Sequence, residues 1–166
     1  MVIAFIPVQG GSKSIPQKNI KPFCGKPLVC WSIEALEACR KVDKVIVATD
    51  SDEIEQIVPS RPYQKTEFYR CSAENTSDTS TAESVMIAYI HAANPAPEAC
   101  FMLVQATSPM TQTKHFSEAL ALYNTARYDS ILSCVRNYRF FWNADGTSMN
   151  YDYTCLLYTS PSPRDS

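Results

Sequence analysis

The chain has 166 residues, of which 45% are hydrophobic and 19% charged, and its formal net charge is −2. These values are typical of one globular domain, and so small a net charge gives no general reason to expect nucleic acid or an anionic membrane as a partner. No stretch approaches the roughly 18 apolar residues of a membrane span. The start, MVIAFIPV, lacks the basic region and cleavage site of a signal peptide, so we expect a first strand and a cytoplasmic location.

The seven cysteines are scattered along the chain with no CxxC pair. An odd count and irregular spacing fit neither a zinc site nor a disulfide framework. Most of them lie in apolar contexts such as LVCWSI and ILSCV, where a free cysteine packs as a small hydrophobic side chain. We therefore expect reduced structural thiols.

Strand-like and helical patterns alternate along the first half of the chain. The apolar run VIAFIPV (2–8) predicts a buried strand, and the apolar spacing within 26–41 predicts a helix. The β-branched run 43–50 predicts a second strand, and 51–58 predicts a short helix with a serine cap and acidic residues in its first turn. TEFYR (66–70) is a further short strand.

The alternation continues in the second half, with a helix over 80–93, a strand over 99–105, a helix over 113–126 and a strand over 129–135. Strands separated by helices of this length indicate βαβ units and a mainly parallel sheet. We therefore predict an open α/β fold with the first strand central. Ligands in such folds bind outside the carboxyl ends of the strands, here at residues 8–19, 49–50, 105–109 and 136–139.

The last residues, CLLYTSPSPRDS (155–166), match no element and resemble a translated adapter tail. We interpret them as a non-native tail and exclude them from fold reasoning, as one would a fusion scar. The expected organisation is one domain over 1–154, truncated at its carboxyl end, followed by the tail 155–166. On this interpretation the natural protein continues past Tyr153.

The loop after the first strand reads QGGSKSIPQKN and contains two of the four glycines. Glycines allow backbone N–H groups to approach an anion closely, and two lysines add positive charge for a polyphosphate. The loop is neither the GxGxxG dinucleotide motif nor the GxxxxGK[ST] phosphate loop. From its composition alone, a phosphate site and a simple surface turn are equally good interpretations.

Other polar residues near strand ends are individually weak signals. Asp50 ends the strand in VATD, where a carboxylate could hold a metal or a hydroxyl or could cap the next helix. NTSDTSTAES (75–84) could likewise cap a helix or hydrogen-bond a ligand. Gln105 follows the strand of LVQATSP, where its amide could recognise a ligand's amide or hydroxyls.

Taken in order, these blocks resemble the acylneuraminate cytidylyltransferases. The resemblance rests on IPVQGGSKSIPQKNIKPFCGKPLVCWSIEAL, VDKVIVATDSDEIEQI, SAENTSDTST, LVQATSP and FFWNADG, and it covers Met1 to about Tyr153. It implies a Rossmann-like fold of the nucleotide-diphospho-sugar transferase type. It also implies that CTP and an N-acylneuraminate or related nonulosonic acid react to CMP-sugar and pyrophosphate with Mg²⁺.

The resemblance also implies a role for individual residues. The glycine-rich loop would cradle the triphosphate, its lysines would neutralise charge on the phosphoryl group and leaving group, and hydroxyls would line the cytidine pocket. By position these are Lys13 and Lys18 as catalytic residues; Val8, Gln9, Gly10, Gly11, Ser12, Asn19, Arg70, Ser80 and Thr81 around the nucleotide; and Gln105 at the sugar acid.

Three positions depart from the family pattern, because Gln9, Cys71 and Thr111 stand where arginines are usual. Arg70 is adjacent to one of them and is a possible substitute. Arginine binds phosphate bidentately and glutamine does not, so we expect weaker CTP binding than in a typical member. Restoring arginine at Gln9 tests this, and no gain in CTP affinity would contradict it.

The family's late metal-binding aspartate motif and its dimerisation segment have no counterpart before the tail. The Mg²⁺ ligands are therefore unknown, Asp50 alone cannot be assigned as one, and a homodimer is expected of the full-length protein. Pseudaminic or legionaminic acid cytidylyltransferases share the GGSK loop and remain alternatives; CMP-Kdo synthetases, with a different loop, are disfavoured. Two further alternatives are a non-catalytic nucleotide-binding remnant and a fragment that does not fold stably.

Overall fold

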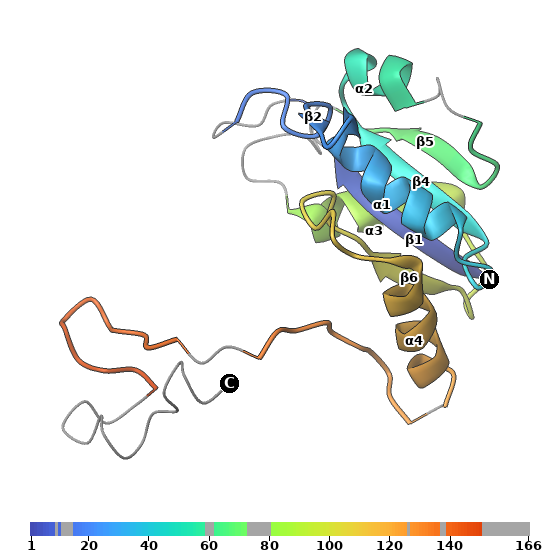
Figure 1. Cartoon of the computed structure of the whole chain (residues 1–166). Helices are drawn as coiled ribbons and strands as arrows, with labels where there is room; N and C mark the ends of the chain where they lie inside the picture. Colours follow the sequence, from blue (N-terminus) through green and yellow to red (C-terminus); the bar gives the residue numbers. More distant parts are fainter. Residues whose placement is uncertain are drawn as a thin grey trace. The chain divides into compact units, whose positions relative to one another are not determined.

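The computed structural model describes residues 1–8, 10, 15–58, 62–72, 81–125, 127–136 and 139–150. The chain divides into two compact units, Met1–Asp129 and Ser130–Ser166. Within its described residues the first unit contains a main sheet, four helices and a small hairpin; Figure 1 shows their arrangement. In chain order they are β1 (Val2–Val8), β2 (Pro22–Phe23), β3 (Lys26–Pro27), α1 (Leu28–Glu37), β4 (Lys44–Thr49), α2 (Asp52–Ile57), β5 (Thr66–Arg70), α3 (Ala82–Ala93), β6 (Cys100–Leu103) and α4 (Thr113–Tyr123).

The main sheet has four parallel strands in the order β5-β4-β1-β6, so the prediction of a central first strand is confirmed. By order of appearance these strands lie 3-2-1-4, the arrangement of half a Rossmann fold. β4 and β5 are added in turn on one side of β1, and β6 is then added on its other side. In folds of this kind the crevice at such a switch point, beyond the carboxyl ends of the strands, is the usual ligand site.

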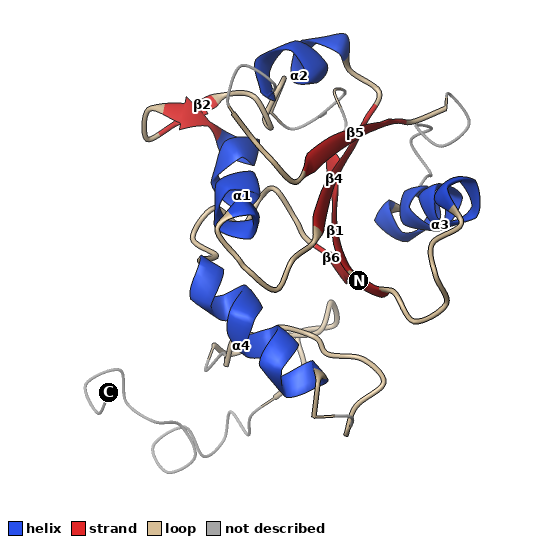
Figure 2. Cartoon of the chain, turned by 90° about the vertical axis from the view of Figure 1, so that its right-hand side faces the viewer, coloured by secondary structure: helices blue, strands red, loops and turns tan. Residues whose placement is uncertain are grey.

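Helices cover both faces of the sheet, with α1 and α4 on one side and α3 on the other (Figure 2). Alternation along β1 sends Ile6 and Val8 into the cluster formed with α1 and α4, and Phe5 into the cluster formed with α3. Because both faces are buried, the strands read as continuous apolar runs, which is why β1 and β4 were predictable from the sequence.

Most element bounds agree with the sequence-based expectation within a few residues. The helix expected over 26–41 begins at Leu28, because Lys26 and Pro27 instead form β3, which pairs with β2. The two-residue turn of this hairpin has positive φ at Cys24 (47°) and Gly25 (87°), the geometry of a type I′ turn. Ser51 is the N-cap residue of α2, as expected, but its side chain makes no capping hydrogen bond.

The strand expected over 129–135 is wrong: within the described part of the chain these residues form no strand. Their apolar side chains are exposed, with Leu132 at 88% and Val135 at 90%. A β-prone run becomes a strand only when a neighbouring strand takes up its backbone hydrogen bonds, and composition cannot supply that neighbour.

The second unit contains a short antiparallel bridge between Trp142 and Ser148. The bridge closes over a turn in which Asp145 accepts hydrogen bonds from the backbone N–H and hydroxyl of Thr147. These two bonds lower the pKa of the Asp145 carboxyl.

The six cysteines in the described residues are free thiols, as expected, and two of them, Cys30 and Cys39, are buried. A search of the same residues finds no helix both long and apolar enough to cross a membrane.

Candidate functional site

The loop after β1 and the turn after β4 meet at the carboxyl edge of the sheet. The register pairs Val8 with Thr49, and two residues later the N–H of Gly10 donates to Oδ1 of Asp50 at 2.9 Å. A Cβ atom added to Gly10 would lie 2.8 Å from Cβ of Ser51. Only glycine allows the two segments to approach this closely. At this position the glycine therefore serves close packing, as well as any contact with a ligand.

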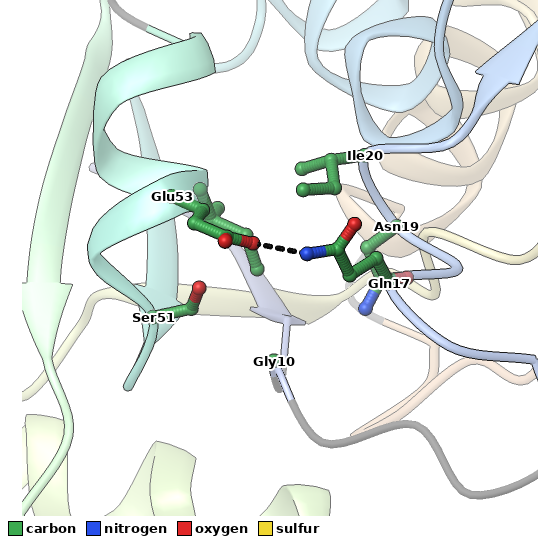
Figure 3. A pocket seen from close by; sticks show the side chains of 7 residues that line it. Gly10, Gln17, Asn19, Ile20, Ser51 and Glu53 are labelled. Carbon is green, nitrogen blue, oxygen red and sulfur yellow. Dashed lines mark hydrogen bonds between the residues drawn. The ribbon is translucent and has the colours of Figure 1, made fainter.

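A small pocket of about 180 Å³, including space open to solvent, lies beside this contact (Figure 3). Its walls come from the segment after β1 and from the first turn of α2. Across it, Nε2 of Gln17 donates to Oε2 of Glu53 at 2.5 Å. The lining residues are Gly10, Gln17, Asn19, Ile20, Ser51, Glu53 and Ile54.

Residues 15–21 form a compact turn that carries Lys18 and Asn19. Gln17 has a positive φ of 52°, and its carbonyl accepts the N–H groups of Ile20 and Lys21. The carbonyl of Asn19 accepts the N–H of Val29 at 2.9 Å, so the turn is attached to the start of α1. Asn19 is buried, at 8% exposure, and Lys18 is half-buried. Backbone bonds thus hold the two predicted site residues at the edge of the sheet.

Arg70 and Cys71 are adjacent in the chain but face opposite sides of the sheet. Tyr69 and Cys71 pack in the α3 cluster, and Phe68 packs in the α1 cluster. Alternation therefore directs Arg70 to the α1 side, where its guanidinium donates to Asp52 at 2.6 Å and pairs with Glu55 at 3.3 Å. The bond to Asp52 raises the pKa of Arg70. The predicted nucleotide contact of Arg70 remains a prediction, and it requires the guanidinium to leave these two carboxylates.

Cys71 occupies the position at the end of β5 where the family pattern has an arginine. Burial raises the pKa of its thiol to about 11, and the nearby negative charge of Asp50 adds to the effect. The thiol is thus neutral near pH 7 and provides no charge for binding an anion.

Thr81 and Gln105 lie at two other ends of secondary structure elements, and neither lines the pocket. Thr81 is the N-cap residue of α3, and its hydroxyl accepts the N–H of Ser84 at 3.2 Å, so the capping interpretation is confirmed. Gln105 follows β6, on the other side of the central strand, with an exposed side chain. Its carbonyl accepts the N–H of Ser108, and the carbonyl of Ser108 accepts the N–H of Thr111.

Five residues of the predicted site lie outside the described residues. They are Gln9, Gly11, Ser12, Lys13 and Ser80. Their predicted roles stay predictions.

The expected Mg²⁺ has no complete ligand set among the described residues, which contain no cluster of three histidine, cysteine, aspartate or glutamate side chains. One oxygen of Asp50 is already an acceptor for Gly10. The described residues alone do not fit a magnesium site.

Sequence reasoning missed the hydrogen-bonded pair at the pocket, Gln17 and Glu53. Glu53 was visible only as one of several acidic residues in the first turn of a helix. Gln17 carried no signal, because neither its positive φ nor its bond across 36 residues can be read from local composition.

A family model described as cytidylyltransferase matches residues 3–158. N-acylneuraminate cytidylyltransferase of Oncorhynchus mykiss is 33% identical over 141 residues, which are 85% of this chain and 32% of that protein. Pseudaminic acid cytidylyltransferase of Campylobacter jejuni is 44% identical over 55 residues, 33% of this chain and 24% of that protein. The solved CMP:2-keto-3-deoxy-manno-octonic acid synthetase complexed with CTP has a TM-score of 0.61 at 23% identity, covering 75% of this chain and 47% of its own.

The structural likeness supports the Rossmann-like nucleotidyltransferase fold alone, because the identity is low. The chain spans about a third of the length of the curated relatives it matches. The family model, by contrast, covers nearly the whole chain from β1 onward, including both segments that meet at Gly10 and Asp50. By this match, the chain belongs to the cytidylyltransferase family.

Proposed function

We propose that the protein is a cytidylyltransferase that activates a nonulosonic acid, an N-acylneuraminate, with CTP to give a CMP-sugar and pyrophosphate. The observation that supports this most directly is the location of Val8, which ends β1, and of Gly10 and residues 15–21, which are the described part of the segment after β1. The glycine-containing segment with the GGSK pattern leaves the central strand at the edge where open parallel sheets bind ligands. The match to the cytidylyltransferase family gives that location its chemistry.

In the proposed reaction the anomeric hydroxyl of the sugar acid attacks the α-phosphorus of CTP. A new P–O bond forms, the bond to the bridging oxygen breaks, pyrophosphate leaves with that electron pair, and the hydroxyl releases its proton. Such transfers depend mainly on positioning and on stabilising negative charge. Two lysines are proposed to stabilise this charge. Lys18 lies among the described residues, and Lys13 lies outside them.

The pocket beside Gly10 does not favour a phosphate group. Glu53 lines it, so an anion there would meet a carboxylate, and the N–H of Gly10 already donates to Asp50. We therefore assign the triphosphate to a place outside this pocket, with Gln105, which follows β6, at the sugar acid.

The test is turnover by the purified 166-residue chain. CTP, N-acetylneuraminate and Mg²⁺ are supplied, and CMP-sugar and pyrophosphate are quantified together. The expected result is equal formation of both products. Lys18→Gln should lower kcat/KM by on the order of tenfold or more, because a charge-assisted contact is lost. Lys21→Gln is the matched control, since this lysine is exposed three residues further on, and it should retain activity.

Two other outcomes separate the alternative functions. CTP binding without product would favour a non-catalytic nucleotide-binding remnant. Faster turnover of pseudaminic acid than of N-acetylneuraminate would favour that substrate, an alternative supported by the 44% identity over 55 residues to a pseudaminic acid cytidylyltransferase. Absence of both CTP binding and turnover in a folded chain would contradict the proposal.

The proposal extends to features of the longer protein. These are Mg²⁺ as cofactor, a homodimer and a cytoplasmic location. Each rests on the resemblance to the acylneuraminate cytidylyltransferases. Gel filtration and metal dependence, measured on a chain extended to the length of the relatives, test the first two.

A further inference from the structure

Two carboxylates of the turn after β4 bind the segment after β1 at two separate points. Asp50 accepts the N–H of Gly10 at 2.9 Å, and Glu53 accepts Nε2 of Gln17 at 2.5 Å. The two acceptors are three residues apart, and the two donors are seven residues apart. Figure 3 shows Gln17 and Glu53 reaching across the pocket towards each other, with Gly10 and Ser51 at its base. Gly10 and Gln17 are thus each held by the same short piece of chain, residues 50–53.

We propose that Asp50 and Glu53 are positioning residues that fix the segment carrying Lys18 and Asn19 for catalysis. The inference deepens the proposed function and rests on it. Neither carboxylate needs to touch CTP. Each acts through its partner, Asp50 by holding the backbone of Gly10 and Glu53 by holding the side chain of Gln17.

The turn that carries these carboxylates is held by hydrogen bonds and by core packing. Thr49 ends β4, is 1% exposed, and its hydroxyl accepts the N–H of Ser51 at 3.1 Å. The carbonyl of Ser51, the N-cap residue of α2, accepts the N–H of Glu55 in the first turn of the helix. Ile54 is buried in the α1 cluster beneath the same turn. This matters because a hydrogen bond can position a catalytic segment only if the group that accepts it is itself held in place.

The second anchor is needed because Gln17 is in a conformation that glutamine rarely adopts. A φ of 52° is unfavourable for a side chain with a Cβ and must be maintained by surrounding bonds. The Gln17 carbonyl holds Ile20 and Lys21, and the side chain bond to Glu53 holds the turn against α2. Without it, the turn loses its lateral attachment next to Lys18.

The first experiment measures the anchors without any nucleotide. Trypsin cleaves the Lys18–Asn19 bond only when this half-buried segment opens, so the nicking rate reports local opening. Asp50→Ala and Glu53→Ala should each raise that rate by about threefold to tenfold, the range of one lost hydrogen bond. Asp50→Asn and Glu53→Gln keep an acceptor oxygen and should nick close to the wild-type rate. Glu118→Ala, an exposed carboxylate on α4, is the charge-matched control.

The second experiment measures the consequence for catalysis. Asp50→Ala and Glu53→Ala should lower kcat severalfold relative to the wild-type chain and to Glu118→Ala. The assay temperature is kept well below the melting temperature of every variant, so that lost stability does not lower kcat. Gln17→Ala should reproduce the effect of Glu53→Ala, and the double variant should be no worse than either single one. Independent, additive effects would overturn the assignment to one shared bond.

The results separate this inference from the proposed function. If the wild-type chain folds but neither binds CTP nor turns it over, the functional proposal fails, whereas the nicking rates still decide whether the two anchors exist. If the wild-type chain is active and the alanine variants nick and turn over like Glu118→Ala, the positioning roles are wrong. Faster nicking with unchanged kcat also overturns the proposal, because the anchors would then have no catalytic consequence.

Discussion

Replacing Gly10 with alanine tests the contact on which the candidate site is built. The added methyl group would lie 2.8 Å from Cβ of Ser51, 3.2 Å from its Oγ and 3.6 Å from Oδ1 of Asp50. Gly10 is not among the described glycines with positive φ, so the substitution strains contacts and not the backbone conformation. The Ser51 Cβ is fixed to the backbone, and the crowding cannot be relieved by rotating a side chain.

The magnitude follows from the distances. Carbon atoms pack best at roughly 3.5–4.0 Å, so one of the two segments must move by about 1 Å. Overpacking of this kind costs about 1–3 kcal/mol, and weakening the Gly10–Asp50 hydrogen bond adds about 1 kcal/mol. We expect Gly10→Ala to lower the free energy of unfolding by about 2–4 kcal/mol. At about 3 °C per kcal/mol for a chain of this size, the melting temperature should fall by about 6–12 °C.

The assay is thermal unfolding followed by circular dichroism, with a rescue variant as control. Ser51→Gly removes the colliding Cβ, and Ser51 makes no side-chain capping bond that would be lost. The double variant Gly10→Ala/Ser51→Gly should therefore recover most of the stability. If the double variant melts as low as Gly10→Ala, the close approach to Ser51 is not the reason for the glycine.

Three further predictions concern other parts of the first unit. At pH 8 the thiol of Cys71 should be alkylated more slowly than that of exposed Cys24, because its raised pKa of about 11 keeps it protonated. Since the folded-state pKa is the higher one, its contribution to stability is complete below the ordinary thiol pKa and is lost as the pH rises towards 11. Glu37→Ala should lower the free energy of unfolding by about 2 kcal/mol, because the carboxylate accepts three hydrogen bonds from residues 64–66. Tyr89→Ala should lower it by about 3–5 kcal/mol, since this ring lies 5.2–6.4 Å from three other aromatic rings on the α3 face.

Each of these predictions has its own control. Equal alkylation rates at Cys71 and Cys24 would contradict the burial of the first thiol. Glu37→Gln keeps one acceptor oxygen and should lose clearly less stability than Glu37→Ala in urea unfolding. Tyr89→Phe keeps the ring, so a loss as large as that of Tyr89→Ala would show that ring packing is not the cause.

The sequence predicted the fold well where burial determines it. β1 and β4 are buried on both faces, and continuous apolar runs reveal such strands at once. The expected strand over 129–135 was wrong, although it too contains an apolar run, because a strand exists only through its neighbour. Local composition carries no information about which edge is available.

The site was predictable only in part for the same reason. The glycine-rich segment was recognised from its pattern, but the collision that requires Gly10 involves Ser51, far along the chain. From the sequence alone, Arg70 is a possible substitute for the arginine that is missing at Cys71. In a strand, one residue is the difference between two faces, so the cation is paired with α2 and the thiol packs under α3.

The central place of β1 also has a consequence for synthesis of the protein. The first strand to leave the ribosome pairs with β4 on one edge and with β6 on the other. Its second edge therefore stays open from the emergence of residue 49 until that of residue 103. At about 5–20 residues per second this interval lasts roughly 3–11 s, long enough for a chaperone to bind an apolar strand that is paired on only one of its two edges.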